Sequence, residues 1–356
     1  MPDEVELLAQ LVAIPSVSGS EQGIAEFVEQ TARKWRMDVV RDDTSVRIEV
    51  RGFGQGQTLA LVSHLDTVPP GGGWTRDPFT PGFEGGRLYG RGSTDAKAAV
   101  AAMLCAARDV IERGRLDAGR LLLVFGYGEE TKDTTMEEAV AGLGSVDAAV
   151  IGEPTNLDFA IAQRGLMMVD LIAEGDQRHA GYAAADGEFT NAVMVLANDL
   201  LRLQSLFEDR GHPLLGLATA TPTMLEAGVS RNVTPPVAKA VLDVRSTPAW
   251  THDELATRLR ESLHSQIVVT SRRLVPCETP PGSRLLAAAH RARPSAREFG
   301  SPTCSDWVFL RDRDAIKCGP GTSRRSHTPD EFVDLAEVSE ARSFYAELAR
   351  VYLAGG

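Results

Sequence analysis

Short apolar segments alternate with helix-like segments in the first third of the chain, and this alternation limits the possible folds more than any other feature. The runs "TLALVS", "RLLLVFGY" and "DAAVIG" are apolar without interruption, which is typical of strands covered on both faces of a sheet. Between the first two lies "DAKAAVAAMLCAARDVIERG", which predicts a helix that begins at Asp95 and is closed by Gly114. An earlier helix is predicted with Ser18 or Ser20 as its N-cap. Strand, helix and strand in this order predict an α/β domain with a mostly parallel sheet.

The middle of the chain has a different pattern. Its segments indicate, in order, a strand, a helix, two strands, a helix and a last strand, "QIVVTSRR". This order suits a small α+β domain that is inserted into the first domain. From about Pro276 the α/β character returns, and the helix-like "EVSEARSFYAELARVYL" follows. We therefore expect a discontinuous first domain, residues 1–164 and 273–356, and an inserted domain, residues 165–272.

Composition and charge argue against several classes of protein. Hydrophobic residues make up 43% and charged residues 24% of the 356 residues, as in soluble globular proteins. The formal net charge of -12 argues against nucleic acid or an anionic membrane surface as the main partner. The segment "MPDEVELLAQ" lacks the layout of a signal peptide, and the longest apolar run, residues 98–107, is too short to span a membrane. The 4 cysteines have no paired spacing, so we expect reduced thiols in a cytoplasmic protein.

A histidine and several carboxylates stand at the ends of the predicted strands. His64 and Asp66 follow "LALVS", and the further positions are Asp95, Glu129, Glu130 and Glu153. Because the carboxyl ends of parallel strands form one edge of a sheet, we expect these side chains to converge there. Converging carboxylates repel one another unless a cation lies among them. Imidazole and carboxylate ligands without thiolate favour zinc, cobalt or manganese, and several carboxylates favour two ions with a shared ligand.

Each of these residues also has a purely structural interpretation. Asp95 can be an N-cap, and His64 can be a packed core histidine. The two adjacent glutamates can be a solvated pair, and Glu153 before Pro154 can terminate a strand. Their joint placement at strand ends favours the metal site.

Five blocks carry a resemblance that extends over nearly the whole chain: "SHLDTVP", "GRGSTDAKAA", "GYGEET", "IGEPTN" and "GPGTSRRSHTPDEFV". In this order they resemble the zinc aminopeptidase and amidohydrolase family that includes acetylornithine deacetylase, succinyl-diaminopimelate desuccinylase and the aminoacylases. The resemblance implies two zinc ions, with cobalt as a possible substitute. By this resemblance the ligands would be His64 and Glu153 for one ion, Glu130 and His327 for the other, and Asp95 as the bridge.

The resemblance also implies roles for two carboxylates beside the ligands. Asp66 would orient the imidazole of His64, as carboxylates commonly do for a ligating histidine. Glu129 would be the general base that takes a proton from the attacking water and returns it to the leaving amine.

Further residues match the family less closely. His179, in "GDQRHAGY", matches an inserted-domain histidine that reaches an active site, often that of the partner subunit, although an ordinary surface histidine is the alternative. The continuation "GYAAADGEF" departs from the family, which leaves the placement of His179 open. Asn232 and Arg245 match positions near the site, with Arg245 either a ligand for a substrate carboxylate or a partner of an acid in its own domain. Gly319, in "CGPGTS", would let the backbone approach the substrate.

These observations predict a metal-dependent enzyme that hydrolyses the amide bond of an N-acyl amino acid. N-acetylornithine or acetylcitrulline, in arginine biosynthesis, is the expected substrate. A hydrolase of carrier-protein-linked lysine or ornithine, a succinyl-diaminopimelate desuccinylase, and a dipeptidase or carboxypeptidase on the same scaffold are the alternatives. A non-catalytic binding protein is a further alternative, which the complete ligand set disfavours. By resemblance, we also expect a homodimer formed through the inserted domain.

Overall fold

The computed structural model describes residues 2–114, 116–131, 135–182 and 189–354. The chain divides into two compact units. Unit 1 comprises residues 1–161, 279–299 and 305–356, and unit 2 comprises residues 162–278 and 300–304. The catalytic and dimerisation roles expected for the two domains stay predictions. None of the described helices is long and apolar enough to cross a membrane.

Unit 1 is built on a mixed sheet whose central strands are parallel. Its strand order is β1-β2-β6-β3-β7-β17-β8, and β6, β3, β7 and β17 run parallel to one another. The strands are β1 (Asp38–Arg41), β2 (Ser45–Arg51), β3 (Gly54–His64), β6 (Ala118–Gly126), β7 (Ala148–Ile151), β8 (Phe159–Gln163) and β17 (Asp314–Lys317), and β16 (Glu298–Ser301) pairs with β8. The last two residues of β8 belong to unit 2, as does β15 (Cys277–Glu278), which pairs with them. A second, smaller sheet has the order β18-β5-β4, from β4 (Gly82–Glu84), β5 (Arg87–Tyr89) and β18 (Phe332–Asp334).

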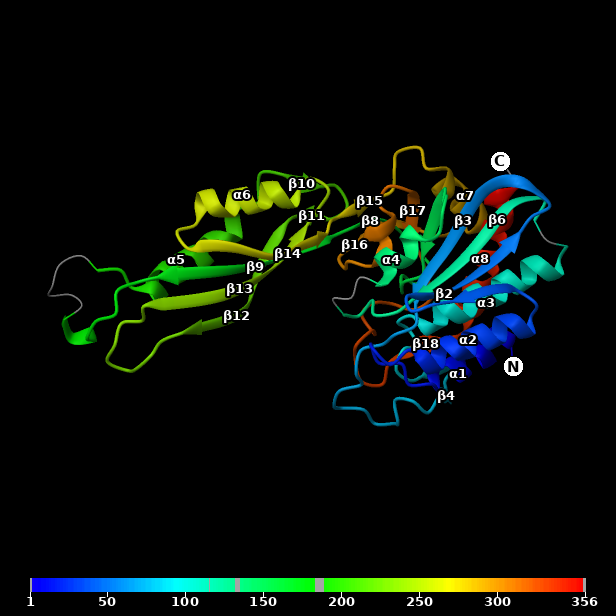
Figure 1. Ribbon diagram of the computed structural model, residues 1–356, viewed down its shortest axis with the longest axis horizontal. Coiled ribbons are helices and arrows are strands. Elements are labelled where there is room, and N and C mark those ends of the chain that lie inside the picture. Colours follow the sequence, from blue (N-terminus) through cyan, green and yellow to red (C-terminus); the bar gives the residue numbers. More distant parts are fainter. Residues whose placement is uncertain (1, 115, 132–134, 183–188, 355–356) are drawn as a thin grey trace. The chain divides into compact units, whose positions relative to one another are not determined.

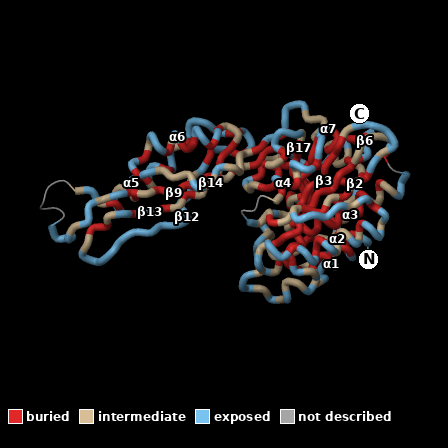
Figure 2. The backbone as a smooth tube through the Cα atoms, in the orientation of Figure 1, coloured by how far each residue is buried: buried red, intermediate tan, exposed pale blue. Residues whose placement is uncertain are grey.

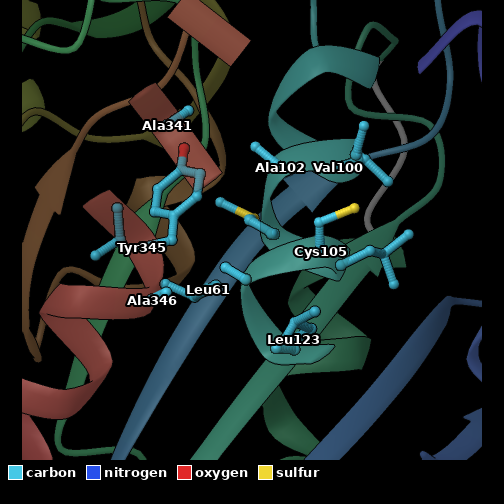
Figure 3. Packing of buried hydrophobic residues seen from close by; sticks show 14 of the residues in the cluster. Leu61, Val100, Ala102, Cys105, Leu123, Ala341, Tyr345 and Ala346 are labelled. Atoms are coloured by element: carbon cyan, nitrogen blue, oxygen red, sulfur yellow. The ribbon is translucent and has the colours of Figure 1, made fainter. Parts of the chain in front are cut away.

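The helices of unit 1 bury the apolar strands. Every residue from Leu59 to His64 of β3 is buried, which requires cover on both faces of the sheet. Figure 3 shows Val100, Ala102 and Cys105 of α3 in the same apolar cluster as Leu61 and Leu123 of the sheet, and Figure 2 shows the buried backbone concentrated along these strands. The helices are α1 (Asp3–Val12), α2 (Gln22–Lys34), α3 (Lys97–Glu112), α4 (Thr135–Ala141), α7 (Arg284–Ala292) and α8 (Leu335–Leu353), with the short η3 (Asp306–Leu310).

Unit 2 is a sheet with helices on one apolar face. Its sheet has the order β12-β13-β9-β14 (Figure 1), and β9 alternates between buried and half-buried residues along its length. Residues of α5 and α6 share one core with the buried positions of β9 and β13. The elements are β9 (Gly165–Glu174), β12 (Thr219–Ala227), β13 (Val237–Ser246), β14 (Gln266–Leu274), α5 (Ala192–Arg202) and α6 (His252–Ser262), with the short η1 (Ala180–Tyr182), η2 (Leu203–Ser205), β10 (Gly211–His212) and β11 (Gly216–Leu217).

The predicted α/β class is confirmed, whereas two local details of the sequence analysis are wrong. Helix α2 has Glu21 as its N-cap residue and no side-chain cap, because Ser18 donates its hydroxyl hydrogen bond to Asp66 instead, at 2.7 Å. Helix α3 begins at Lys97 rather than Asp95, so the carboxylate of Asp95 is not its cap.

Candidate metal centre

The parallel strands bring the predicted ligands to one edge of the sheet. His64 is the last residue of β3 and lies opposite Gly126, the last residue of β6, so Glu129 and Glu130 follow at the same edge. Glu153 comes two residues after β7, which pairs with β3 on its other side. One possible ligand atom from each of His64, Asp95 and Glu130 falls within 4.8 Å of the others. The edge therefore holds a cluster of imidazole and carboxylate groups.

The two imidazoles of this cluster face the two oxygens of one carboxylate. His64 Nε2 lies 3.3 Å from Asp95 Oδ1, and His327 Nε2 lies 3.8 Å from Asp95 Oδ2. The same His64 nitrogen is 3.8 Å from the carboxylate of Glu153, and the same His327 nitrogen is 2.9 Å from that of Glu130. The groups thus form two pairs, one on each side of Asp95. This arrangement suits two cations that share Asp95 as a ligand.

Asp66 is fully buried and connects the His64 strand to the loop that carries the glutamates. Its Oδ1 lies 3.3 Å from His64 Nδ1. Its oxygens also accept the peptide N–H groups of Glu129 and Glu130, at 3.1 and 3.0 Å, and the hydroxyl of Ser18. The imidazole is therefore held with Nε2 toward Asp95, which is the orientation that a ligating histidine needs. The hydrogen bond from Ser18 to Asp66 was not predicted from the sequence, because the position of Ser18 suggested a helix cap.

The close packing of buried ionisable groups shifts the pKa values of three members of the cluster. Burial raises the pKa of Glu129 well above its usual value, and the neighbouring Glu153 raises it further. Burial, followed by the charge of Asp95, raises the pKa of Glu153 to about 7. Burial lowers the pKa of His64, but hydrogen bonds to Asp66 and Asp95 outweigh it and hold this pKa well above its usual value. A divalent cation among these groups would favour the ionised form of the two glutamates and the neutral form of the imidazole, which are the forms that bind metal.

The donor set therefore fits divalent metal ions with nitrogen and oxygen ligands. Neutral imidazole and carboxylates are ligands of zinc, cobalt and manganese. Asp66 supplies the carboxylate partner that commonly orients a metal-bound histidine. Glu129 precedes Glu130, and its peptide N–H donates to Asp66, as that of Glu130 does. The two histidine–glutamate pairs about Asp95 are complete without Glu129 as a ligand.

Three of the predicted residues lie in unit 2, where their described contacts are local. His179 is exposed, and its Nδ1 accepts the peptide N–H of Gly181. Asn232 is also exposed, and its side chain accepts the hydroxyl of Ser230. Arg245 binds Asp243, two positions away on β13, through Nε at 2.7 Å and Nη2 at 3.0 Å. The segment 183–188, where the sequence departs from the family pattern, lies outside the described residues. The roles expected for these residues stay predictions.

Gly319 belongs to unit 1 and lies against the backbone of Glu153. A Cβ at this position would be 2.6 Å from the carbonyl oxygen of Glu153. The carbonyl oxygen of Gly319 accepts the peptide N–H groups of Thr155 and Leu157. This close approach requires glycine whether or not a substrate binds there, so its predicted contact with substrate stays untested.

One buried residue near the cluster gave no signal in the sequence. Glu331 is 1% exposed, and it follows His327 in the stretch "HTPDEF". In the sequence alone, a glutamate that follows a predicted metal ligand cannot be distinguished from an exposed glutamate in a loop. Its burial depends on contacts with distant segments of the chain.

Comparison with known proteins identifies a family and full-length relatives. A model described as peptidase family M20/M25/M40 matches residues 60–351. A succinyl-diaminopimelate desuccinylase of Phenylobacterium zucineum is 28% identical over 385 residues, which cover 99% of this chain and 99% of that protein.

Solved structures have the same fold. The M20 family metallo-carboxypeptidase Sso-CP2 of Sulfolobus solfataricus matches with a TM-score of 0.78 and 18% identity, over 99% of both chains. A dinuclear metal-binding peptidase of the M20 family from Bacillus subtilis matches with a TM-score of 0.77 and 17% identity, over 99% of this chain and 98% of that one. At such identities the likeness concerns the fold.

Proposed function

Because this chain belongs to peptidase family M20/M25/M40, whose members are metal-dependent hydrolases of amides and peptides, we propose that it removes the acyl group from an N-acyl amino acid with the help of two metal ions. The observation that carries the proposal is the paired arrangement of His64 and His327 about the two oxygens of Asp95. Zinc is the proposed metal, with cobalt as a functional substitute.

The chain's own residues have distinct parts in this proposal. His64 and Glu153 would hold one ion, Glu130 and His327 the other, and Asp95 both. When bound, the ions would lower the pKa of a water molecule and polarise the substrate carbonyl. Glu129 accepts the proton of the attacking water and then donates it to the nitrogen of the departing amine.

The relatives and the sequence blocks favour different substrates. The full-length likeness to a succinyl-diaminopimelate desuccinylase supports a succinylated or otherwise acylated diamino acid. The sequence blocks favour N-acetylornithine or acetylcitrulline, and lysine or ornithine linked to a carrier protein is the third possibility. In all three cases the cleaved bond is an amide of an amino acid. Arg245 is the proposed guanidinium for a substrate carboxylate, and Asn232, His179 and the backbone at Gly319 are the other proposed contacts.

A panel assay tests the proposed reaction. Protein loaded with zinc, or in parallel with cobalt, is incubated with succinyl-diaminopimelate, N-acetylornithine, N-acetylcitrulline, a glutamyl-lysine conjugate and two dipeptides, and free amine is measured. We expect one acyl amino acid to be hydrolysed fastest. The Glu129→Gln protein should release far less free amine from it than the parent does. Faster release from the dipeptides would identify a peptidase instead. No turnover by protein that has bound both ions would contradict the proposal.

A homodimer formed through unit 2 is proposed as the assembly. Strand β12 stands at the end of the sheet order, and its Met224 and Leu225 are 68% and 63% exposed. An edge strand with exposed apolar side chains is suited to pairing with a second copy. Light scattering at micromolar concentration should give twice the mass of the chain, and Leu225→Lys should lower it. A monomer at that concentration would contradict the dimer and the proposed action of His179 across subunits.

A further inference from the structure

The backbone around Asp95 is held by a single buried carboxylate, that of Glu331. Its Oε1 accepts the peptide N–H groups of Thr94, at 2.9 Å, and Asp95, at 3.0 Å. Its Oε2 accepts the peptide N–H of Gly92, at 3.1 Å, and Nη1 of Arg91, at 2.6 Å. The carboxylate therefore receives N–H groups from a continuous turn of chain that ends at the proposed bridging ligand.

Two short strands bring Glu331 to this turn. Strand β18 begins at Phe332 and pairs with β5, so that Phe332 lies opposite Tyr89. The carbonyl oxygen of Glu331 itself accepts the peptide N–H of Gly90, at 2.9 Å. The side chain of Thr94 donates in turn to the carbonyl oxygen of Phe332. The position of the turn is thus fixed relative to the segment that also carries His327.

Arg91 extends the same connection to the loop that follows His64 and Asp66. Both Arg91 and Glu331 are 1% exposed. Through Nη2 the guanidinium donates to the carbonyl oxygen of Pro70, at 3.2 Å, and Trp74 donates to the same oxygen, at 2.7 Å. Pro70 stands in the loop that follows His64 and Asp66. One carboxylate and its guanidinium partner therefore join the three chain segments that supply His64, Asp95 and His327.

We propose that Glu331 is a positioning residue, which sets the place of Asp95 between the two imidazoles through hydrogen bonds to the turn 92–95 and through Arg91. The proposal rests on the proposed metal centre, since it concerns how that centre is held. Residues that orient metal ligands without touching the ion commonly change metal affinity about 10- to 100-fold when they are replaced. Glu331 differs from most of them in acting on the backbone of the ligand rather than on its side chain.

The substitution Glu331→Gln tests the proposal with little change of volume. A glutamine has one acceptor oxygen, so its NH2 group must face either Arg91 or the peptide N–H groups of Thr94 and Asp95. A donor then meets a donor in a buried place, and the turn must shift. We expect weaker binding of metal, by about 10- to 100-fold for the less tightly held ion. The visible absorption spectrum of cobalt-loaded protein should change as well, because it reports the arrangement of the ligands.

Glu4→Gln is the matched control within the same unit. Glu4 is 3% exposed and accepts Arg342 Nη1 at 2.7 Å, so this variant also loses a buried carboxylate next to a guanidinium. Its contacts join α1 to α8 and involve none of the proposed ligands. A merely structural role for Glu331 predicts that both variants lose stability alike and keep the parent's metal affinity and cobalt spectrum. A positioning role predicts that only Glu331→Gln changes them.

The outcomes separate this inference from the function on which it rests. Metal affinity is measured by competition with a chelator, and unfolding by urea gives the stability of each variant. If Glu331→Gln does not fold, Glu331→Asp, which keeps the charge but is one methylene shorter, is measured in its place with the same expectation. Metal affinity and a cobalt spectrum equal to the parent's in the folded variant would overturn the positioning role alone. A parent protein that binds no divalent ion would overturn the metal centre and this inference together.

Discussion

Replacing Glu129 by glutamine should remove the proposed base and leave the rest of the site in place. The peptide N–H of residue 129 donates to Asp66 Oδ1 at 3.1 Å, and this bond does not depend on the side chain. The glutamine amide occupies nearly the same volume as the carboxylate. The neutral amide also removes the repulsion between the carboxylates of residues 129 and 153, which helps to raise the pKa of Glu129. We therefore expect Glu129→Gln to fold and to bind both ions.

The expected loss is in the catalytic step. A positioned general acid–base group contributes about 10²- to 10⁴-fold to the rate. At about 1.4 kcal/mol for each tenfold change, this corresponds to about 3–5 kcal/mol of barrier. Because the same carboxylate is proposed to transfer the proton twice, the loss should fall mainly on kcat and much less on KM.

The assay combines turnover with metal content measured on the same preparation. Glu130→Gln is the comparison, because it changes the adjacent carboxylate, which lies 2.9 Å from His327 and is a proposed ligand. It should lower the occupancy of one ion, whereas Glu129→Gln should not. A Glu129→Gln protein that holds both ions and retains kcat within about tenfold of the parent would show that Glu129 is not the base.

Three further changes follow from the contacts around the cluster. Gly319→Ala places a Cβ 2.6 Å from the carbonyl oxygen of Glu153, so we expect lower stability in urea and weaker metal binding, and unchanged values for both would contradict this packing. Ser18→Ala removes one hydrogen bond to Asp66 and should lower the free energy of unfolding by about 1 kcal/mol, with a smaller effect on kcat than Glu129→Gln. Metal affinity should rise between pH 5 and pH 8, because Glu153, with a pKa of about 7 in the metal-free protein, must lose its proton to bind a cation. Since the unfolded chain loses that proton at lower pH than the folded one, metal-free protein should become less stable as the pH rises through the same range, and urea unfolding that shows the opposite slope would refute the assignment.

The sequence was sufficient to predict the strands and their polar ends. Short, uninterrupted apolar runs such as "RLLLVFGY" are typical of strands buried on both faces of a sheet. In a parallel sheet, the residues that follow such strands all lie at the same edge. The positions of His64 and Glu153 at one edge could therefore be expected before any coordinates. The first helix predicted for the middle of the chain is likewise present as α5 (Ala192–Arg202), with Asn191 as its N-cap.

Contacts between distant segments could not be predicted in this way. Ser18 donates to Asp66 across 48 positions of the chain, although its local sequence favours a helix cap. Glu331 reaches Asp95 across 236 positions, and nothing in the residues around it indicates that it is buried. Arg245 could bind either a substrate or an acid of its own unit, and the pairing with Asp243 depends on the alternation of side chains along β13. Such choices are decided by tertiary packing rather than by local pattern.

The proposed metal centre should bind two metal ions in each chain, and this number can be measured. Protein is stripped with a chelator, reconstituted with zinc, freed of excess metal and analysed for zinc per chain, in parallel with the Asp95→Ala variant. We expect two ions in the parent and at most one in the variant, because Asp95 faces both imidazoles. Fewer than two ions in the parent, or two ions retained without Asp95, would contradict the proposed metal centre.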